Sequence, residues 1–170
     1  MRTASKAPPR NVAALLGILQ ATDGNDSRTL DAKRAAAAKD LGDLGDLQAE
    51  AALIQALSHP NQVSVAAALA LGRMRLASAV APLVAVLEDQ HKFWMPRGAA
   101  AVALGHMGPL AATALPALTK ALEYDLINAG TSWDVLARDA VEDAVRHLSD
   151  PAAACTLELH GKRYAIWGFS

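Results

Sequence analysis

A three-part pattern recurs along this chain and constrains its fold more than any other feature. Each copy has an alanine-rich stretch, a glycine-containing turn and a second apolar stretch that ends in Leu-x-x-x-Leu. The copies occupy residues 34–58, 64–88 and 97–123. Similar segments at a fixed period are typical of solenoids, in which each unit packs against its neighbours along one axis. The pattern therefore predicts a repeat protein.

The glycines of the turns set the register of the repeats. They are Gly42, Gly72 and Gly105, and they recur at a period of roughly 30 residues. A further unit aligns at residues 137–148, and residues 11–21 resemble the second helix of an incomplete first unit. Apolar residues within the units follow helical spacing, and no strand pattern separates one unit from the next. We predict an all-α fold, an α-solenoid of about four helix pairs over residues 10–150.

Composition supports packed helices and argues against several functional classes. Hydrophobic residues make up 52% of the chain but aromatic residues only 4%, a balance that favours closely packed helices over a β-sandwich. With 16 basic and 17 acidic residues, the chain lacks the basic excess of a dedicated nucleic-acid or anionic-membrane binder. The single cysteine, Cys155, fits a reducing compartment. No apolar run approaches the roughly 20 residues of a membrane span, so we expect a cytoplasmic protein.

The two ends of the chain depart from the repeat. Residues 1–9 are short, basic and proline-containing, and we interpret them as a flexible tail. Residues 151–170 are interpreted as a capping segment. Within it, residues 156–167 alternate around His160-Gly161, which is compatible with a short β-hairpin that covers the end of the stack. The alternative is an edge strand that pairs with another chain and makes a homo-oligomer.

The residues before the turns resemble HEAT repeats, in particular the short HEAT-like repeats of phycobilisome lyases. Those repeats have the pattern Val-Arg-x-x-Ala-Ala-x-Ala-Leu-Gly. Residues 96–105 are Pro-Arg-Gly-Ala-Ala-Ala-Val-Ala-Leu-Gly, and residues 65–72 are Val-Ala-Ala-Ala-Leu-Ala-Leu-Gly. The resemblance covers roughly residues 10–148. It implies stacked helix pairs whose second helices line a concave face. Such repeats serve adaptors, subunit scaffolds, lyases and nucleic-acid enzymes alike.

The resemblance also implies a role for a residue that recurs near the start of the repeats. The positions, in chain order, are Arg34, Ser64, Arg97 and Arg138. In the family, an arginine here ties a loop carboxylate to the start of the next helix. A guanidinium suits that role because it donates two parallel hydrogen bonds to a carboxylate. Asp89 and Asp125 are the candidate carboxylates.

The sequence predicts no catalytic residue, no metal and no cofactor. The five histidines form no His-x-x-x-His pair. The iron-dependent hydroxylases of the family depend on His-Glu pairs, and no such dipeptide occurs. Asp40, Asp43 and Asp46 are spaced by three, but they lack the glycine placement and terminal glutamate of an EF-hand loop. We interpret them as turn and cap residues. Neither a Gly-x-Ser-x-Gly elbow nor a phosphate-binding glycine loop is present.

Two equivalent loops carry four of the aromatic side chains, and the solenoid would place these loops on one edge. An aromatic cluster beside arginine has the composition of a protein-interface hot spot. The alternative is that the two tryptophans of these loops pack beneath the helices that follow them. Charged residues at the ends of the second helices form a neutral to acidic rim nearby. The predicted binding residues are Phe93, Trp94, Arg97, Glu88, Lys120, Glu123, Tyr124 and Trp133.

These features favour a non-enzymatic module for protein–protein interaction or scaffolding, with a protein as its partner. Two alternatives stay open. The first is a lyase-like or regulatory subunit that acts on a chromophore- or cofactor-carrying protein and needs a pocket for a small molecule. The second is a HEAT-like nucleic-acid-binding protein. The rim argues against nucleic acid, because contact with phosphates requires Lys or Arg there.

Overall fold

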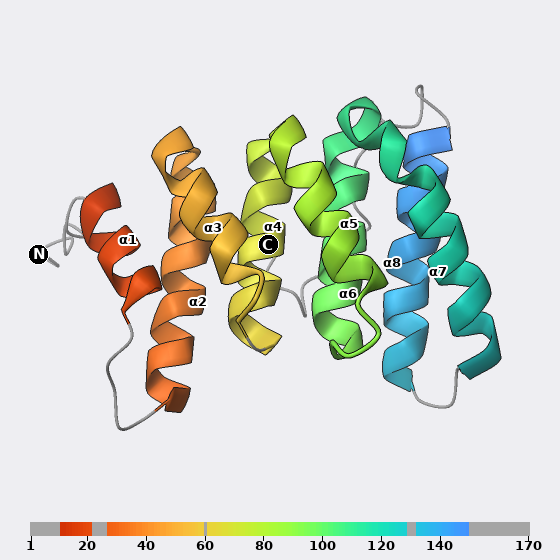
Figure 1. Ribbon diagram of the computed structural model, residues 1–170, viewed down its shortest axis with the longest axis horizontal. Coiled ribbons are helices and arrows are strands. Elements are labelled where there is room, and N and C mark those ends of the chain that lie inside the picture. The colour runs from red at the N-terminus through yellow and green to blue at the C-terminus, as the bar shows by residue number, and fades with distance from the viewer. Residues whose placement is uncertain (1–10, 22–26, 60, 129–131, 150–170) are drawn as a thin grey trace, which may run out of the picture.

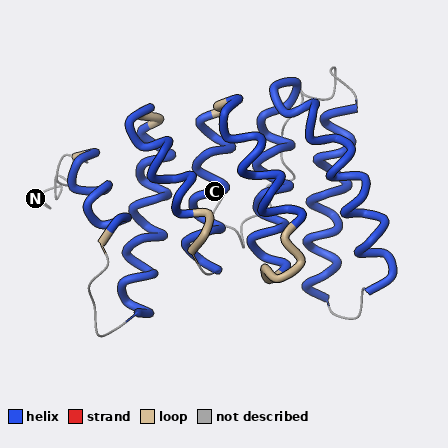
Figure 2. The backbone as a smooth tube through the Cα atoms, in the orientation of Figure 1, coloured by secondary structure: helices blue, strands red, loops and turns tan. Residues whose placement is uncertain are grey.

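Helices account for the regular structure of the part of the chain that the structure describes (Figure 1). The computed structural model describes the backbone of residues 11–21, 27–59, 61–128 and 132–149, and the side chains of these ranges apart from positions 27, 61, 124–128 and 132–137. Within these ranges no strand occurs, and short loops join the helices (Figure 2). The predicted all-α fold is confirmed. The predicted N-terminal tail, C-terminal capping segment and hairpin lie outside the described residues.

The helices alternate between two layers (Figure 1). One layer holds α2 (Ser27–Leu44), α4 (Asn61–Met74), α6 (Trp94–Met107) and α8 (Ser132–Ser149). The other holds α1 (Val12–Gln20), α3 (Glu50–Ala56), α5 (Val80–Glu88) and α7 (Leu115–Asn128). In the first layer, α2 packs on α4, α4 on α6 and α6 on α8. Among the described helices, the pairs α2/α3, α4/α5 and α6/α7 are complete, and α1 and α8 have no described pair partner at the two ends. This arrangement is the predicted solenoid of about four pairs.

A short 3-10 helix joins the two members of each pair. These connections are η1 (Leu47–Ala49), η2 (Ala77–Ala79) and η3 (Gly108–Ala114), and we call residues 44–49, 75–79 and 108–114 together the turn edge. The chain turns through a left-handed residue just before or at the start of each connection, at Gly45 (φ 65°), Arg75 (φ 51°) and Gly108 (φ 56°). Such a residue ends a helix and reverses the chain. Arg75 does so despite its side chain, which is uncommon outside glycine.

The glycines that set the repeat register have a different role from the one predicted. Gly42, Gly72 and Gly105 lie inside α2, α4 and α6, three residues before the left-handed positions. A Cβ on Gly72 would lie 2.7 Å from the Cα atom of Ala103 on α6. The equivalent distance from Gly42 to the Cα of Ala70 is 2.6 Å. These glycines are therefore contact points between neighbouring first-layer helices and not turn residues.

The central helix α6 is enclosed by its neighbours. Ten of its residues are buried, and Ala101 and Leu104 are both 0% exposed. The stretch Trp94–Glu123 is long and apolar enough, by composition alone, to cross a membrane. It is interrupted by the non-helical backbone of Ala111, and 56% of its most apolar window is buried. Its hydrophobicity is accounted for by its place in the core of the solenoid.

A row of polar side chains crosses the last turns of the first-layer helices. The Asp43 carboxylate on α2 lies 3.3 Å from a guanidinium nitrogen of Arg73 on α4. His106 follows on α6 and His147 on α8. Burial lowers the pKa of His106 below its usual 6.5, and the charges of His147, Arg73 and Arg75 lower it further. The folded protein therefore favours the neutral form of this imidazole.

We expect His106 to make the stability of the protein depend on pH. Because the pKa of His106 is lower in the folded than in the unfolded chain, the unfolded chain takes up a proton first as pH falls. The free energy of unfolding should therefore decline as pH drops below about 6.5 and level off below the folded pKa. Urea unfolding at pH about 7.5 and about 5.5 measures the decline. His106→Gln should reduce it, whereas His91→Gln, at an exposed position, should not. An equal decline in all three proteins would contradict the assignment.

Candidate functional site

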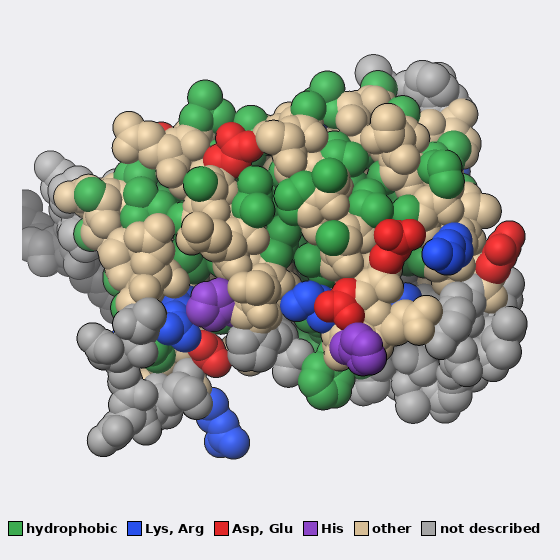
Figure 3. Space-filling model, in the orientation of Figure 1, with side chains coloured by type: hydrophobic (Ala, Val, Ile, Leu, Met, Phe, Trp, Pro, Cys, Tyr) green, Lys and Arg blue, Asp and Glu red, His purple; other side chains and the backbone are tan. Residues whose placement is uncertain are grey.

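An open cleft lies between the second-layer helices α5 and α7. Figure 3 shows Lys/Arg and Asp/Glu side chains close together on this part of the molecular face. It has an empty volume of about 370 Å³, part of which is open to solvent. Three of the predicted binding residues, Glu88, Arg97 and Lys120, line it together. The remaining lining residues are Leu87, Gln90, Ala117 and Ala121. We call this the α5–α7 cleft.

Small side chains on α7 keep the cleft open. Leu87 is 1% exposed and Ala121 is 7% exposed, so together with Ala117 they form an apolar floor. In the repeat alignment, Ala117 and Ala121 stand where α5 has Pro82 and Val86. At two successive turns on the same side of the helix, the side chains of α7 are therefore smaller than the equivalent side chains of α5. An apolar side chain of a partner would find both room and apolar contacts here.

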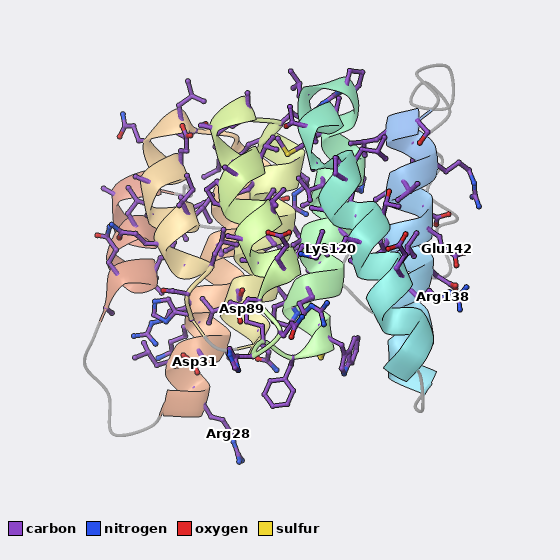
Figure 4. All side chains as sticks on the ribbon, turned by 45° about the vertical axis from the view of Figure 1, so that its right-hand side comes forward. Arg28, Asp31, Asp89, Lys120, Arg138 and Glu142 are labelled. Carbon is purple, nitrogen blue, oxygen red and sulfur yellow. The ribbon has the colours of Figure 1, made fainter. Side chains whose placement is uncertain are left out.

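Two charged side chains face each other across the mouth of the cleft. Lys120 Nζ on α7 lies 3.9 Å from Glu88 Oε1 at the end of α5, and Figure 4 shows Lys120 between the two helices. The side chains are 76% and 48% exposed, and a pair this exposed contributes at most about 1 kcal/mol to stability. Because the pair is weak, either charge is available to a charged group of a partner.

Arg97 joins the start of α6 to the end of α5. Its Nε donates a hydrogen bond of 2.9 Å to the carbonyl oxygen of Leu87. A helix leaves its last carbonyls without partners inside the helix, so this bond satisfies one of them. The family resemblance implied that this arginine ties a loop carboxylate to the start of the next helix, and the contact described at its Nε is with the backbone carbonyl of Leu87.

Equivalent positions in the other repeats make the same kind of contact. Ser64 Oγ donates to the carbonyl oxygen of Leu57 at 2.9 Å, and Arg34 donates to the carbonyl oxygen of Ala21. Each therefore links a first-layer helix to the end of the second-layer helix before it. Arg138 differs, because its Nε lies 2.7 Å from the Glu142 carboxylate one turn along α8 (Figure 4). The recurring residue thus has a structural role in three consecutive units.

The loop from Asp89 to Phe93 contributes Gln90 to the cleft and presents an exposed aromatic ring at its end. Asp89 Oδ1 accepts a hydrogen bond of 3.0 Å from the backbone nitrogen of His91. The backbone carbonyl oxygen of Asp89 accepts a hydrogen bond of 3.1 Å from the backbone nitrogen of Lys92. Phe93 follows at the N-cap of α6 and is 67% exposed. Trp94, the first residue of α6, is half-buried. The loop is therefore held in a turn while its phenylalanine faces solvent.

The other predicted binding residues are not brought into the cleft by the described structure. Glu123 is exposed on α7, about one turn beyond Lys120. Tyr124 and Trp133 belong to α7 and α8, but their side chains lie outside the described residues. Sequence reasoning missed the lining residues Leu87, Gln90, Ala117 and Ala121. For Ala117 and Ala121, the available signal was the change to smaller residues from Pro82 and Val86 of the preceding second helix.

The described side chains contain no group of three His, Cys, Asp or Glu residues that could hold a metal ion. The carboxylates considered in the sequence have other contacts: Asp46 Oδ1 accepts a hydrogen bond of 2.9 Å from the backbone nitrogen of Gln48 and caps η1, and Asp43 pairs with Arg73. Asp46 is therefore a cap residue as interpreted, whereas Asp43 lies inside α2 and pairs with the neighbouring helix α4.

Comparison with known families identifies the repeats. A family described as HEAT repeats matches residues 12–93, and the PBS lyase HEAT-like repeat matches residues 96–124. The chain belongs to the HEAT-repeat family. The two matches cover α1 to α7 apart from the first residues of α6 and the end of α7. No curated protein matches the chain. As a HEAT-repeat protein, it is a protein-interaction module of the repeat type.

Proposed function

We propose that this HEAT-repeat protein is a non-enzymatic binding module whose protein partner docks at the α5–α7 cleft and on Phe93. The observation that carries the proposal is the convergence of Glu88, Arg97 and Lys120 around an apolar floor. The loop that contributes Gln90 to this cleft continues to Phe93, whose ring is 67% exposed. Aromatic anchors beside a pocket are typical of binding hot spots.

The chemistry of the cleft defines the part of the partner that fits it. The floor of Leu87, Ala117 and Ala121 accepts an aliphatic or aromatic side chain, because burial of such a group is favourable. The mouth offers one carboxylate and one ammonium group, so it favours a partner segment with a charged or amide group beside its apolar anchor. The acidic groups at the end of α5, Glu88 and Asp89, disfavour nucleic acid, whose phosphates they would repel.

Two substitutions test the proposal at separate parts of the site. Phe93→Ala removes the exposed ring, and Ala117→Leu fills the cleft from α7. Each is expected to weaken partner binding at least tenfold, about 1.4 kcal/mol or more. Neither should lower the melting temperature much, because the ring is exposed and the cleft has room for the added atoms.

The matched control is Ile18→Ala. Ile18 is also an exposed large hydrophobic residue, 39% exposed, but it lies on α1 at the far end of the solenoid (Figure 1). Quantitative affinity capture with wild type and the three variants identifies proteins lost with Phe93→Ala and Ala117→Leu and kept with Ile18→Ala. Direct titration of such a protein then gives the change in Kd. A partner that binds both site variants as tightly as wild type would refute the proposal.

A further inference from the structure

The first-layer helices have an outer side that points away from the second layer. On α6, Arg97 reaches the end of α5, and Leu104 stands about two turns later on the same side of the helix. Ala103 and Gly105 are turned from Leu104 by about 100° in opposite directions, toward α4 and α8 respectively. Val102 therefore lies nearly opposite Leu104, on the outer side of the layer.

The outer side is apolar in the middle of the layer and charged at both ends. The positions equivalent to Val102, in order from α2 to α8, are Lys39, Leu69, Val102 and Asp143. On α4, Val65 precedes Leu69 by one turn, and on α6, Met95 precedes Val102 by about two turns on the same side. We call Val65, Leu69, Met95 and Val102 the outer apolar patch.

The outer apolar patch is buried although the described helices leave this side of the first layer open (Figure 1). Leu69 is 5% exposed and Val102 is 6% exposed. In the second layer, by contrast, Ala81 and Ala85 point outward from the central helix α5 and are exposed. A place in the middle of a layer is therefore not enough to bury an outward side chain. The exposures are those of a single chain, so the atoms that cover the patch belong to the chain itself.

Among the segments outside the described backbone, residues 150–170 have the composition of such a cover. The others are residues 1–10, 22–26, 60 and 129–131, and Met1 is the one large apolar residue in them. Residues 150–170 contain Leu157, Leu159, Tyr164, Ile166, Trp167 and Phe169. Neither α7 nor α8 adjoins Leu69, because α7 lies in the second layer and α6 separates α8 from α4 (Figure 1).

The length of this segment is sufficient to reach the patch. It follows α8, which packs on α6, so α4 is about 20 Å away at two helix spacings. Residues 150–156 span up to about 24 Å when extended. Leu157 and the residues after it can therefore lie on the outer side of α4 and α6.

The end of the stack, where the sequence predicted a cap, is polar. Arg146 stands at the position of Gly105 in the previous unit, on the side of α8 that faces away from α6, and 68% of its side chain is exposed. Glu142, one turn earlier on this side, pairs with Arg138. An apolar segment on this surface would bury charged groups, which is costly. The outer apolar patch carries no such cost.

We propose that residues 150–170 fold back over the outer apolar patch and tie α8 to α4. Their large apolar side chains cover Leu69 and Val102, and burial of such groups is favourable. In a solenoid each unit contacts only its neighbours, so this contact links helices that are not adjacent. It does not involve the α5–α7 cleft, which lies on the second-layer side.

Photo-crosslinking in the full chain tests the contact. p-Benzoylphenylalanine is placed at position 164 or 167 in turn, and the products are mapped by mass spectrometry after irradiation. We expect crosslinks within one chain of 17.7 kDa, from at least one position, to the outer sides of α4 or α6. Crosslinks confined to α8 or the second layer, crosslinks only between two chains, or none at all would each overturn the proposal.

Two substitutions test whether the patch and the segment hold each other. Val102→Glu places a carboxylate under the segment, and Leu157→Glu changes the segment while leaving every described helix unaltered. Each should make trypsin cleavage after Lys162 or Arg163 at least about tenfold faster than in wild type, because cleavage follows the population of the released segment. Circular dichroism checks that the helices remain.

The matched control is Ala85→Glu, at an exposed position of α5 in the other layer. It should keep both the crosslinks and the slow cleavage of wild type. Wild-type protein that is cleaved as fast as Leu157→Glu would overturn the proposal, and this comparison holds even if Val102→Glu does not fold.

Discussion

Replacement of Gly72 by alanine should lower the free energy of unfolding by about 3 kcal/mol, near the upper end of the usual cost of overpacking. The added Cβ would lie 2.7 Å from the Cα and 2.8 Å from the Cβ of Ala103. Both atoms belong to the α6 backbone or are fixed to it, so no rotamer change relieves the overlap. Helices α4 and α6 would have to move apart at the centre of the solenoid. Chemical denaturation followed by circular dichroism measures the loss.

Two other glycines of the same protein, in less crowded surroundings, serve as controls for Gly72→Ala. A Cβ on Gly17 in α1 would meet nothing within 4 Å, so Gly17→Ala should raise stability by up to about 1 kcal/mol through helix propensity alone. A Cβ on Gly105 would lie 3.1 Å from the Cα of Ala144, so Gly105→Ala should cost less than Gly72→Ala. If Gly72→Ala were as stable as wild type, close helix contact would not be the reason for glycine at this position.

The fold was predictable because its repeats agree in several columns at once. A single alanine-rich stretch fits a helix in many folds, but three copies in register fit stacked helix pairs. The role of Gly72 was not predictable to the same degree. A glycine needed for a left-handed turn and one needed for close contact look identical in sequence. The structure separates them, because the turn falls three residues later, at Arg75, where the sequence shows no glycine.

The candidate site was predictable in part for the same reason. Repeat register placed Glu88 at the end of one second helix and Lys120 near the end of the next, and the cleft between them joins both with Arg97. The hydrogen bond from Arg97 to the carbonyl of Leu87 could not be read from the side chains, because every residue has a carbonyl. The volume of the cleft depends on Ala117 and Ala121, and alanine is so common in this chain that neither residue stood out.

Truncation of Leu104 to alanine should cost about 3–4 kcal/mol, a large part of the 5–15 kcal/mol that stabilises a typical domain. Leu104 is 0% exposed and lies on α6, which contacts α4, α5 and α8. Because these neighbours are also held by other repeats, they cannot all close around the missing atoms, and a cavity remains. Denaturant titration of the variant and wild type gives the difference in unfolding free energy.

Two controls separate burial and volume from the identity of the residue. Leu104→Met keeps the volume and should cost less than about 1.5 kcal/mol. Leu44→Ala makes the same truncation at a position that is 41% exposed, where surrounding water replaces the lost atoms, and it should cost less than about 1 kcal/mol. Equal losses for Leu44→Ala and Leu104→Ala would mean that α6 is not the centre of the core. A large loss for Leu104→Met would mean that side-chain shape matters more at this position than the volume it fills. The expected order places the stability of the solenoid in the contacts of its central helix, which leaves the exposed side chains at the mouth of the α5–α7 cleft free to change without loss of the fold.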